Sequence, residues 1–298
     1  MNARVDLSSL PPPEVVEVLD FDAVLAAILD DMRVRAPHLA PALEFESEPV
    51  VILAQAMAWR EVTLRARIND AARGTMLAYA SGGSLDQLAA LLGIVRLVVD
   101  PGDPSAQPPV PPTMESDARL RARTQEALEG FSTCGPARAY AHHARSVDGR
   151  IADVAVGSPA PGTVQVVIAA FEADGSHTDA PRDAVLTALR DDDVRPLTDL
   201  VLVESAAPVA VDVTATLRIA DGPDVQLVVD AARTRLEAAM RAVRLIGRDV
   251  PLSAIYAALH GGGIAGVELV EPAEDVVIGD LEVPVLGEVT LTRTAVIP

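Results

Sequence analysis

Residues 50–94 have the most regular pattern of apolar side chains in the chain. These side chains recur at steps of three, four and seven positions, at Val50, Leu53, Met57, Leu64, Ile68 and Ala71. At about 3.6 residues per turn they share one side of a helix, so the pattern predicts a long amphipathic helix. Gly82 and Gly83 are expected to end it, because glycine readily adopts the left-handed turn that terminates helices.

Two further helices are expected beside the long one. Ser84 and Gln87 fit a capping box, in which the serine hydroxyl accepts a hydrogen bond from the Gln87 amide, and Gly93 closes this short helix. Upstream, Asp20 is a candidate N-cap for an apolar helix that runs to Ala36. Residues 50–94 therefore predict a helical hairpin with one face to bury, and the upstream helix is expected to pack on it.

Charged residues on the long helix are candidates for a contact between subunits. Some border the apolar stripe and others lie further round the helix, so they are not confined to the opposite face. A solvated face with weak pairs, such as Glu61 with Arg65, explains them as well as a seam in which charges set register. The candidate interface residues are Arg60, Glu61, Leu64, Arg65, Arg67, Ile68, Asp70 and Arg73.

The whole sequence predicts an α+β protein with an N-terminal helical domain followed by two small α+β domains. Residues 1–97 form an arm and the helical domain, and the prolines at 11–13 favour an extended arm that could reach a neighbouring subunit. The proline-rich residues 98–113 predict a semi-rigid linker. Residues 114–205 predict helices and the first α+β domain, and residues 206–298 predict the second, ending in two strands.

Composition argues against several classes of partner. A formal net charge of −19 opposes binding to nucleic acid or to an anionic membrane. The sequence has neither an apolar run near the roughly 20 residues that span a bilayer nor a signal-peptide pattern, so cytoplasmic synthesis is expected. Aromatic residues make up only 3% of the chain, so stability is expected to depend on many small contacts and on partner surfaces.

Motifs for catalysis or metal binding are weak. His142 and His143 are adjacent, so they do not form the i, i+4 pair that holds a metal. Residues 191–193 are three aspartates that fit a helix-terminating turn better than a cation site. Residues 261–266 satisfy G-x-G-x-x-G, but a helix precedes them and a strand follows, the reverse of a nucleotide-binding fold. Cys134 is the single cysteine and has no identifiable base. The sequence nominates no metal ligand, cofactor or catalytic residue.

A family resemblance is carried by four strings. RINDAARGTMLAYASGGSLDQLAALLGI closely resembles the baseplate J-like proteins of contractile phage tails and phage-tail-like bacteriocins. Further matches follow in the same order at GPARAYAHHARSVDGRIADVAVGSPAPGTVQVVI, at RPLTDLVLVESA and at GRDVPLSAIYAALHGGGIAGVELVEP. Together they span most of the chain.

The resemblance implies a structural wedge protein of a tail baseplate, without catalysis. In such a role, paired copies would join neighbouring wedges into a ring around the central hub and tube, and the ring would rearrange when the sheath contracts. The implied partners are a small lysozyme-like-fold wedge protein and the tail protein that links to fibres. The resemblance also favours the subunit seam on the long helix, because the family uses helical regions to join neighbouring subunits.

Two other classes of function stay open. A tail-associated hydrolase acting on envelope polymers would need two converging carboxylates in a pocket, and the sequence offers no pair to nominate. A cytoplasmic adaptor unrelated to tails would be separated by whether neighbouring genes encode sheath and tube proteins. For the structural role, a mechanical hypothesis follows: the α+β domains stay rigid, while the linker at residues 98–113 lets the helical domain take different angles in non-equivalent copies.

Overall fold

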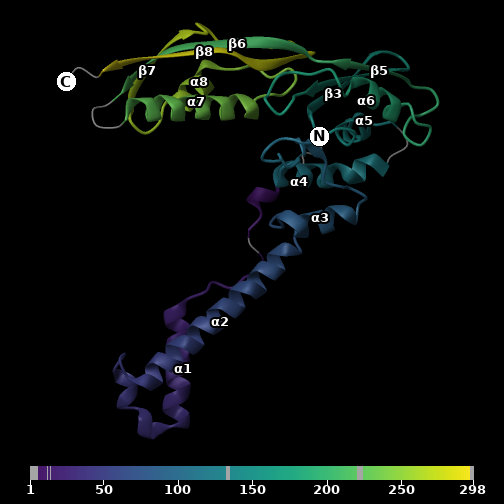
Figure 1. Cartoon of the computed structure of the whole chain (residues 1–298). Helices are drawn as coiled ribbons and strands as arrows, with labels where there is room; N and C mark the ends of the chain where they lie inside the picture. Colours follow the sequence, from purple (N-terminus) through teal and green to yellow (C-terminus); the bar gives the residue numbers. More distant parts are fainter. Residues whose placement is uncertain (1–5, 12, 14, 132–134, 220–223, 296–298) are drawn as a thin grey trace. The chain divides into compact units, whose positions relative to one another are not determined.

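The computed structural model describes residues 6–11, 13, 15–131, 135–219 and 224–295 of the 298-residue chain (Figure 1). The chain divides into two compact units, Met1–Val95 and Arg96–Pro298. The first unit is helical and the second contains small sheets with helices on them, so the predicted α+β class is confirmed. None of the helices in the described part of the chain is long and apolar enough to cross a bilayer.

The first unit is built on two packed helices, α1 and α2. Asp20 caps α1 as predicted, because its carboxylate accepts hydrogen bonds from the amides of Asp22 and Ala23. Proline at the first turn of α2 suits its start, because that amide has no helical partner. The elements of this unit are η1 Leu7–Ser9, α1 Phe21–Arg35, η2 Pro37–Leu39, η3 Ala42–Glu44, α2 Pro49–Gly74 and α3 Gly82–Ala90.

The end of the long helix differs from the prediction. α2 ends at Gly74, and Gly82 and Gly83 form the first turn of α3 instead of stopping α2. The N-cap of α3 is Ser81, so the capping box at Ser84 is wrong. Ser84 packs against the end of α2, and a Cβ on Gly74 would lie 3.3 Å from its Oγ. A larger residue at Gly74 would therefore make a tight contact with Ser84.

The face of α2 that is buried within its own unit also differs from the predicted stripe. Val51, Ala54 and Ala58 are buried there, and the two alanines let α1 approach closely. The larger apolar side chains of the predicted stripe are each more than half exposed, at Leu53, Met57, Leu64 and Ile68. The long helix thus has two apolar faces, of which the unit covers only the one made of small residues.

Residues 98–113 are folded, although their composition suggests a linker. The segment β1 (Val98–Asp100) pairs antiparallel with β2 (Thr113–Met114), and Asp103 bridges to Val110 between them. Gly102 has a φ of +67° and lies under the Pro111 carbonyl, where a Cβ would not fit. The hairpin belongs to the second compact unit, and the boundary between the units falls between Val95 and Arg96.

The first small α+β domain is a three-stranded sheet with helices on one face. The sheet order is β3-β4-β5, with β3 antiparallel and β5 parallel to β4, and α6 makes the crossover that a parallel pair needs. Under the helices, Tyr140, Ile168 and Leu189 are buried in one core. The observed elements are α4 Asp117–Glu126, η4 Ala127–Phe131, α5 Ala137–Arg145, β3 Ile151–Ala160, β4 Thr163–Ala170, α6 Arg182–Leu189 and β5 Leu200–Ser205.

The second small domain repeats this plan with a different strand order, β7-β6-β8. Alternating residues of β6, such as Val213 and Leu217, are buried under α7 and α8, which lie on one face of the sheet in Figure 1. The tail contributes one long strand instead of the predicted two, because the residues before the turn at Gly279 form only an isolated bridge, between Val276 and Val250. The elements are β6 Ala207–Ile219, α7 Val225–Ala242, α8 Leu252–Leu259, β7 Ile264–Glu271 and β8 Glu282–Ala295.

The two small domains share a third apolar cluster. The open face of the first sheet contributes Val167 and Phe171, which pack with Val283 from β8. The guanidinium of Arg244 lies 4.4 Å from the centre of the Phe171 ring, and the Asp153 carboxylate accepts a hydrogen bond from the Ile246 amide. These contacts join the two sheets into one compact unit.

Candidate subunit interface on the N-terminal helices

The N-terminal arm lies on its own long helix. Asn69 of α2 is buried, and its side-chain amide binds both the amide and the carbonyl of Glu17, at 3.0 and 2.8 Å. Further along, the Tyr79 hydroxyl donates to the Leu10 carbonyl at 2.8 Å. These bonds recognise the main chain of the arm. From the sequence the arm could reach a neighbouring subunit, whereas in this structure it binds the long helix of its own chain.

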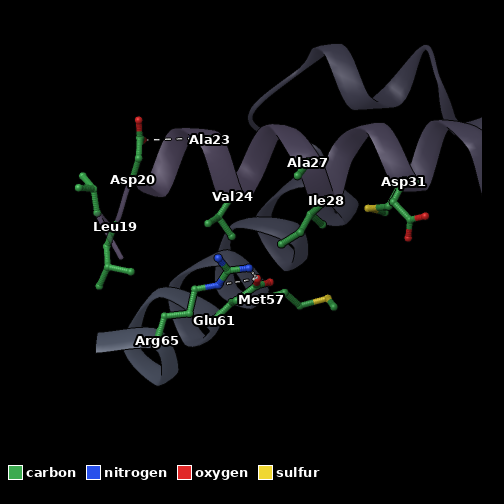
Figure 2. Close-up of a pocket in the computed structure, with 12 residues that line it drawn as sticks. Leu19, Asp20, Ala23, Val24, Ala27, Ile28, Asp31, Met57, Glu61 and Arg65 are labelled. Carbon is green, nitrogen blue, oxygen red and sulfur yellow. Dashed lines mark hydrogen bonds and ion pairs between the residues drawn. The ribbon is translucent and has the colours of Figure 1, made fainter. Parts of the chain in front are cut away.

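An apolar groove of about 580 Å³ runs between α1 and α2 (Figure 2). Val24 and Ile28 of α1 and Met57 of α2 line its floor, and Figure 2 shows these side chains pointing into the space between the two helices. The carboxylates of Asp31 and Glu61 lie along it. The groove is therefore an apolar surface with carboxylates along its rim, which suits an apolar helix flanked by cations.

The charged residues of the groove already have partners, among them Arg35 for Asp31 at 2.7 Å. Arg65 binds Glu61 through Nη2 at 2.6 Å and Glu17 through Nη1 at 3.1 Å. The hydrogen bond with Glu61, together with the charges of both carboxylates, raises the pKa of Arg65. Asp20 caps α1 through its carboxylate. Asp20, Asp31 and Glu61 thus each have a structural role, as a helix cap or in an ion pair.

The candidate interface residues divide into three groups. Leu64 and Ile68 lie on the uncovered apolar side of α2, and the steps of the helix place Arg60 and Arg67 along one border of it. Neither arginine has an ion-pair partner in the part of the chain that the structure describes. Two candidates line the groove and two pair with each other further round: Glu61, Arg65, Asp70 and Arg73.

Sequence reasoning missed the residues that α1 brings to this surface. Periodicity alone gives each helix a stripe, but not which side of α1 faces α2, so the acid at Asp31 was not expected beside Met57. It also missed Trp59, which lies on another side of α2 with its ring 6.4 Å from that of Phe21 and is mostly exposed. A lone tryptophan in an alanine-rich helix could have been the signal, because exposed tryptophans concentrate at protein contacts.

The weak motifs of the sequence have structural roles in the second unit. His142 is buried, which lowers its pKa to about 4, and His143 binds the Gly130 carbonyl at 3.2 Å. Asp191 accepts from the Asp193 amide in a turn after α6. Residues 261–263 connect α8 to β7 and residues 264–266 begin β7, the order expected from the sequence. Cys134 lies outside the described residues. Within the described ranges, no cluster of three or more His, Cys, Asp or Glu side chains could hold a metal.

Comparison with known proteins gives three matches to models of one family. The baseplate J-like N-terminal domain matches residues 46–103, the central domain residues 132–205 and the C-terminal domain residues 211–292. The chain is 42% identical to Baseplate protein J of Escherichia phage P2 over 283 residues, which cover 93% of this chain and 94% of that protein. The chain belongs to the baseplate J-like family.

Membership of the baseplate J-like family supports a structural role in a phage-tail baseplate. A solved structure of the baseplate of the anti-feeding prophage contains a chain that is 13% identical, with a TM-score of 0.34. The match covers 91% of this chain and only 56% of that one, and so low a score adds nothing to the family assignment. The match to the family's N-terminal domain covers α2, α3 and the start of the hairpin. It therefore includes residues on both sides of the boundary between the compact units.

Proposed function

We propose that this protein is a structural subunit of a tail baseplate that joins neighbouring subunits through its N-terminal helices. One observation carries the proposal: the stripe formed by Leu53, Met57, Leu64 and Ile68 stays uncovered when the unit is folded. Monomeric proteins rarely leave an apolar surface of this kind in contact with water. The stripe lies next to the groove between α1 and α2, because Met57 belongs to both.

The stripe and the groove complement each other in charge. Arg60 and Arg67 flank the stripe, and Asp31 and Glu61 flank the groove. A second copy that lays its stripe toward this groove would bring Arg60 and Arg67 to these carboxylates as additional cations, beside Arg35 and Arg65 that already pair with them, while apolar side chains fill the space between. Arginine suits such a seam, because its planar guanidinium can bind a carboxylate through two hydrogen bonds.

The expected energy of this contact favours a role inside a larger assembly. Covering the exposed half of a leucine-sized side chain contributes about 1 kcal/mol, so the four large residues of the stripe contribute about 4 kcal/mol. Bringing two proteins together costs about 4–15 kcal/mol. The stripe alone would therefore hold a pair of subunits only weakly, and a ring that adds further contacts would hold it firmly.

The finer role that we propose is that of a wedge protein. Paired copies would join wedges into a ring around the central hub and tube of a contractile phage tail or a phage-tail-like bacteriocin. The small lysozyme-like-fold wedge protein and the fibre-linking tail protein would be its other partners. We place this work in the tail baseplate of a particle assembled in the bacterial cytoplasm, and we propose no cofactor and no catalysis. Family membership and the similarity to the phage P2 protein support this role.

The proposed rearrangement on sheath contraction would occur at the boundary between the compact units. The hairpin at residues 98–114 packs within the second unit, where Leu97 and Glu115 bind each other through their main chains. A change of angle would therefore arise at Val95 and Arg96, just before that hairpin, instead of along the proline-rich segment. Imaging the particle before and after contraction tests this, and identical angles between the units in every copy would refute it.

The interface is tested by charging the stripe. In Leu64→Asp the substituted side chain is mostly exposed in the free subunit, so folding should be unaffected, while a buried carboxylate would oppose the seam. The matched control is Leu227→Asp, which changes another mostly exposed leucine, on α7. Each variant gene replaces the natural one in its own particle, and complete baseplates are counted by electron microscopy. We expect Leu64→Asp to lose baseplates and the control to keep them. Equal numbers from both would refute the interface.

A further inference from the structure

Strand β5 has one side that nothing in its own sheet covers. It is the last strand in the order β3-β4-β5. The amide of Leu200 donates to the Gly162 carbonyl and that of Ala206 to the Ile168 carbonyl, both at 2.8 Å, so the even-numbered residues point their main-chain groups toward β4. The amides and carbonyls of Val201 and Val203 therefore point the other way.

One side chain marks the open side directly. Nη2 of Arg190, in the turn after α6, lies 3.4 Å from the carbonyl oxygen of Val201, which is long for a hydrogen bond. This bond reaches the carbonyl from outside the sheet, and that carbonyl has no main-chain partner among the described residues. A main-chain amide at the usual distance of about 2.9 Å would satisfy it better.

The edge has little protection against strand pairing. Proteins block an edge strand with charged side chains, above all lysine, with proline or with a bulge. β5 reads LVLVES, its register with β4 runs without a shift, and its charged groups are Glu204 in the strand and Arg190 at the Val201 carbonyl. Leu200 is 55% exposed, and Leu197 just before the strand is 91% exposed. A weakly protected apolar edge of this kind is a site for adding a strand.

We propose that β5 pairs antiparallel with β5 of a second copy, around a two-fold axis at Leu202. In this register Val201 faces Val203 of the partner subunit, and each such pair exchanges two main-chain hydrogen bonds through the groups that point outward. Leu202 then faces its own copy in a pair without hydrogen bonds, where side chains come closest. The two sheets become one continuous sheet across the axis. This contact is separate from the helical interface and does not rest on it.

The sequence of β5 is self-complementary in this register, which favours a second copy over another protein. Glu204 is the only charged residue of the strand, and it faces Leu200 of the partner subunit, so no like charges meet. The valines of both strands fall on the side that the helices cover, and the leucines fall on the open side. They lie on the same face as Val167, and the hydrogen bond between the Gln165 and Glu204 side chains, at 2.9 Å, lies between Leu202 and Val167.

Cysteine cross-linking of the full-length chain tests the register. Leu202→Cys is made together with Cys134→Ser, so that the introduced thiol is the only one, and the control carries Leu227→Cys in the same background. Cα atoms in a pair without hydrogen bonds lie about 4.5 Å apart, within the range for a disulfide. Under mild oxidation we expect Leu202→Cys to give covalent dimers at least about tenfold faster than the control. Equal rates would overturn the proposal.

Two charge substitutions on the same strand give a second test with opposite signs. Leu202→Lys would place like charges opposite each other at the axis, and Leu200→Lys would place a cation opposite Glu204 of the partner subunit. A cross-strand pair changes association by up to about fivefold. Sedimentation of the full-length chain should therefore show weaker association for the first variant and equal or tighter association for the second. Equal weakening by both would contradict the register. Leu64→Asp should leave the β5 cross-link unchanged, so failure of one interface can be told from failure of the other.

Discussion

His142 should make the second unit lose stability in weak acid. Its side chain on α5 is only 6% exposed, and its Nδ1 atom has no hydrogen-bond partner among the described residues. Gly130 passes so close that a Cβ there would lie 2.6 Å from the ring. Burial, followed by the charges of His143, Arg123 and Arg145, lowers the pKa of His142 to about 4. The folded protein therefore holds this ring neutral.

The size of the effect follows from the difference in pKa between the unfolded and folded states. The unfolded chain binds a proton at His142 below about pH 6.5, while the folded chain does so only below about pH 4. Stability associated with the neutral ring is thus complete above pH 6.5 and is lost as the pH falls toward 4. A difference of about 2.5 pH units, at about 1.36 kcal/mol each, amounts to a loss of about 3 kcal/mol.

The assay compares wild type with His142→Gln, which cannot titrate, and with His260→Gln, which removes an exposed histidine from the same unit. Urea unfolding followed by circular dichroism at several pH values between 7 and 4 gives the free energies. Carboxylates titrate equally in all three proteins, so the difference between the curves isolates the histidine. The wild-type and His260→Gln curves should fall more steeply than that of His142→Gln. Parallel curves, or a His142 titration by NMR near pH 6.5, would refute the reasoning.

Two further predictions concern buried polar contacts. Glu115, whose side chain is fully buried, binds Arg123, so Glu115→Gln should cost about 3–5 kcal/mol in urea unfolding, whereas Glu129→Gln at an exposed pair should cost at most about 1 kcal/mol. A small effect of Glu115→Gln would mean that water reaches the pair. Asn69→Ala should release the N-terminal arm, and faster hydrogen exchange at the Glu17 amide would show it; unchanged exchange would mean that other contacts hold the arm.

Much of the second unit could be predicted from local pattern. Val211, Val213 and Leu217 alternate with polar residues, which indicates the strand β6, and Pro159 to Gly162 form a strong turn signal, which indicates the hairpin of β3 and β4. Strand order could not be read in this way. Nothing local says that β6 is the central strand and that β8 pairs parallel to it, because that choice depends on contacts more than 70 positions apart, such as Thr216 with Thr292. The bridge between the sheets at Asp153 is equally non-local.

The helical unit shows a different failure of local reasoning. A stripe of large apolar residues is normally the face that a helix buries, and for α2 that rule selected Leu53 and Leu64. The structure buries Ala54 and Ala58 instead, because small side chains allow α1 to pack at close range. Leu53 and Leu64 can be buried, as the rule predicts, only if another molecule covers them. The sequence therefore predicted correctly that α2 has a stripe of large apolar residues, but the fold of the unit leaves that stripe exposed.

Net charge and the apolar surfaces act over different distances. The chain carries a formal charge of −19, so free copies repel each other, but salt at physiological strength screens this repulsion beyond about 8 Å. Contact through the stripe acts only at a few ångströms, where Arg60 and Arg67 replace the average negative charge by a local positive one. In the proposed contact, copies that meet stripe to groove gain both apolar burial and charge pairing, which collisions between other acidic surfaces do not supply. An acidic chain with exposed leucines can in this way stay dispersed and still associate through a few defined surfaces.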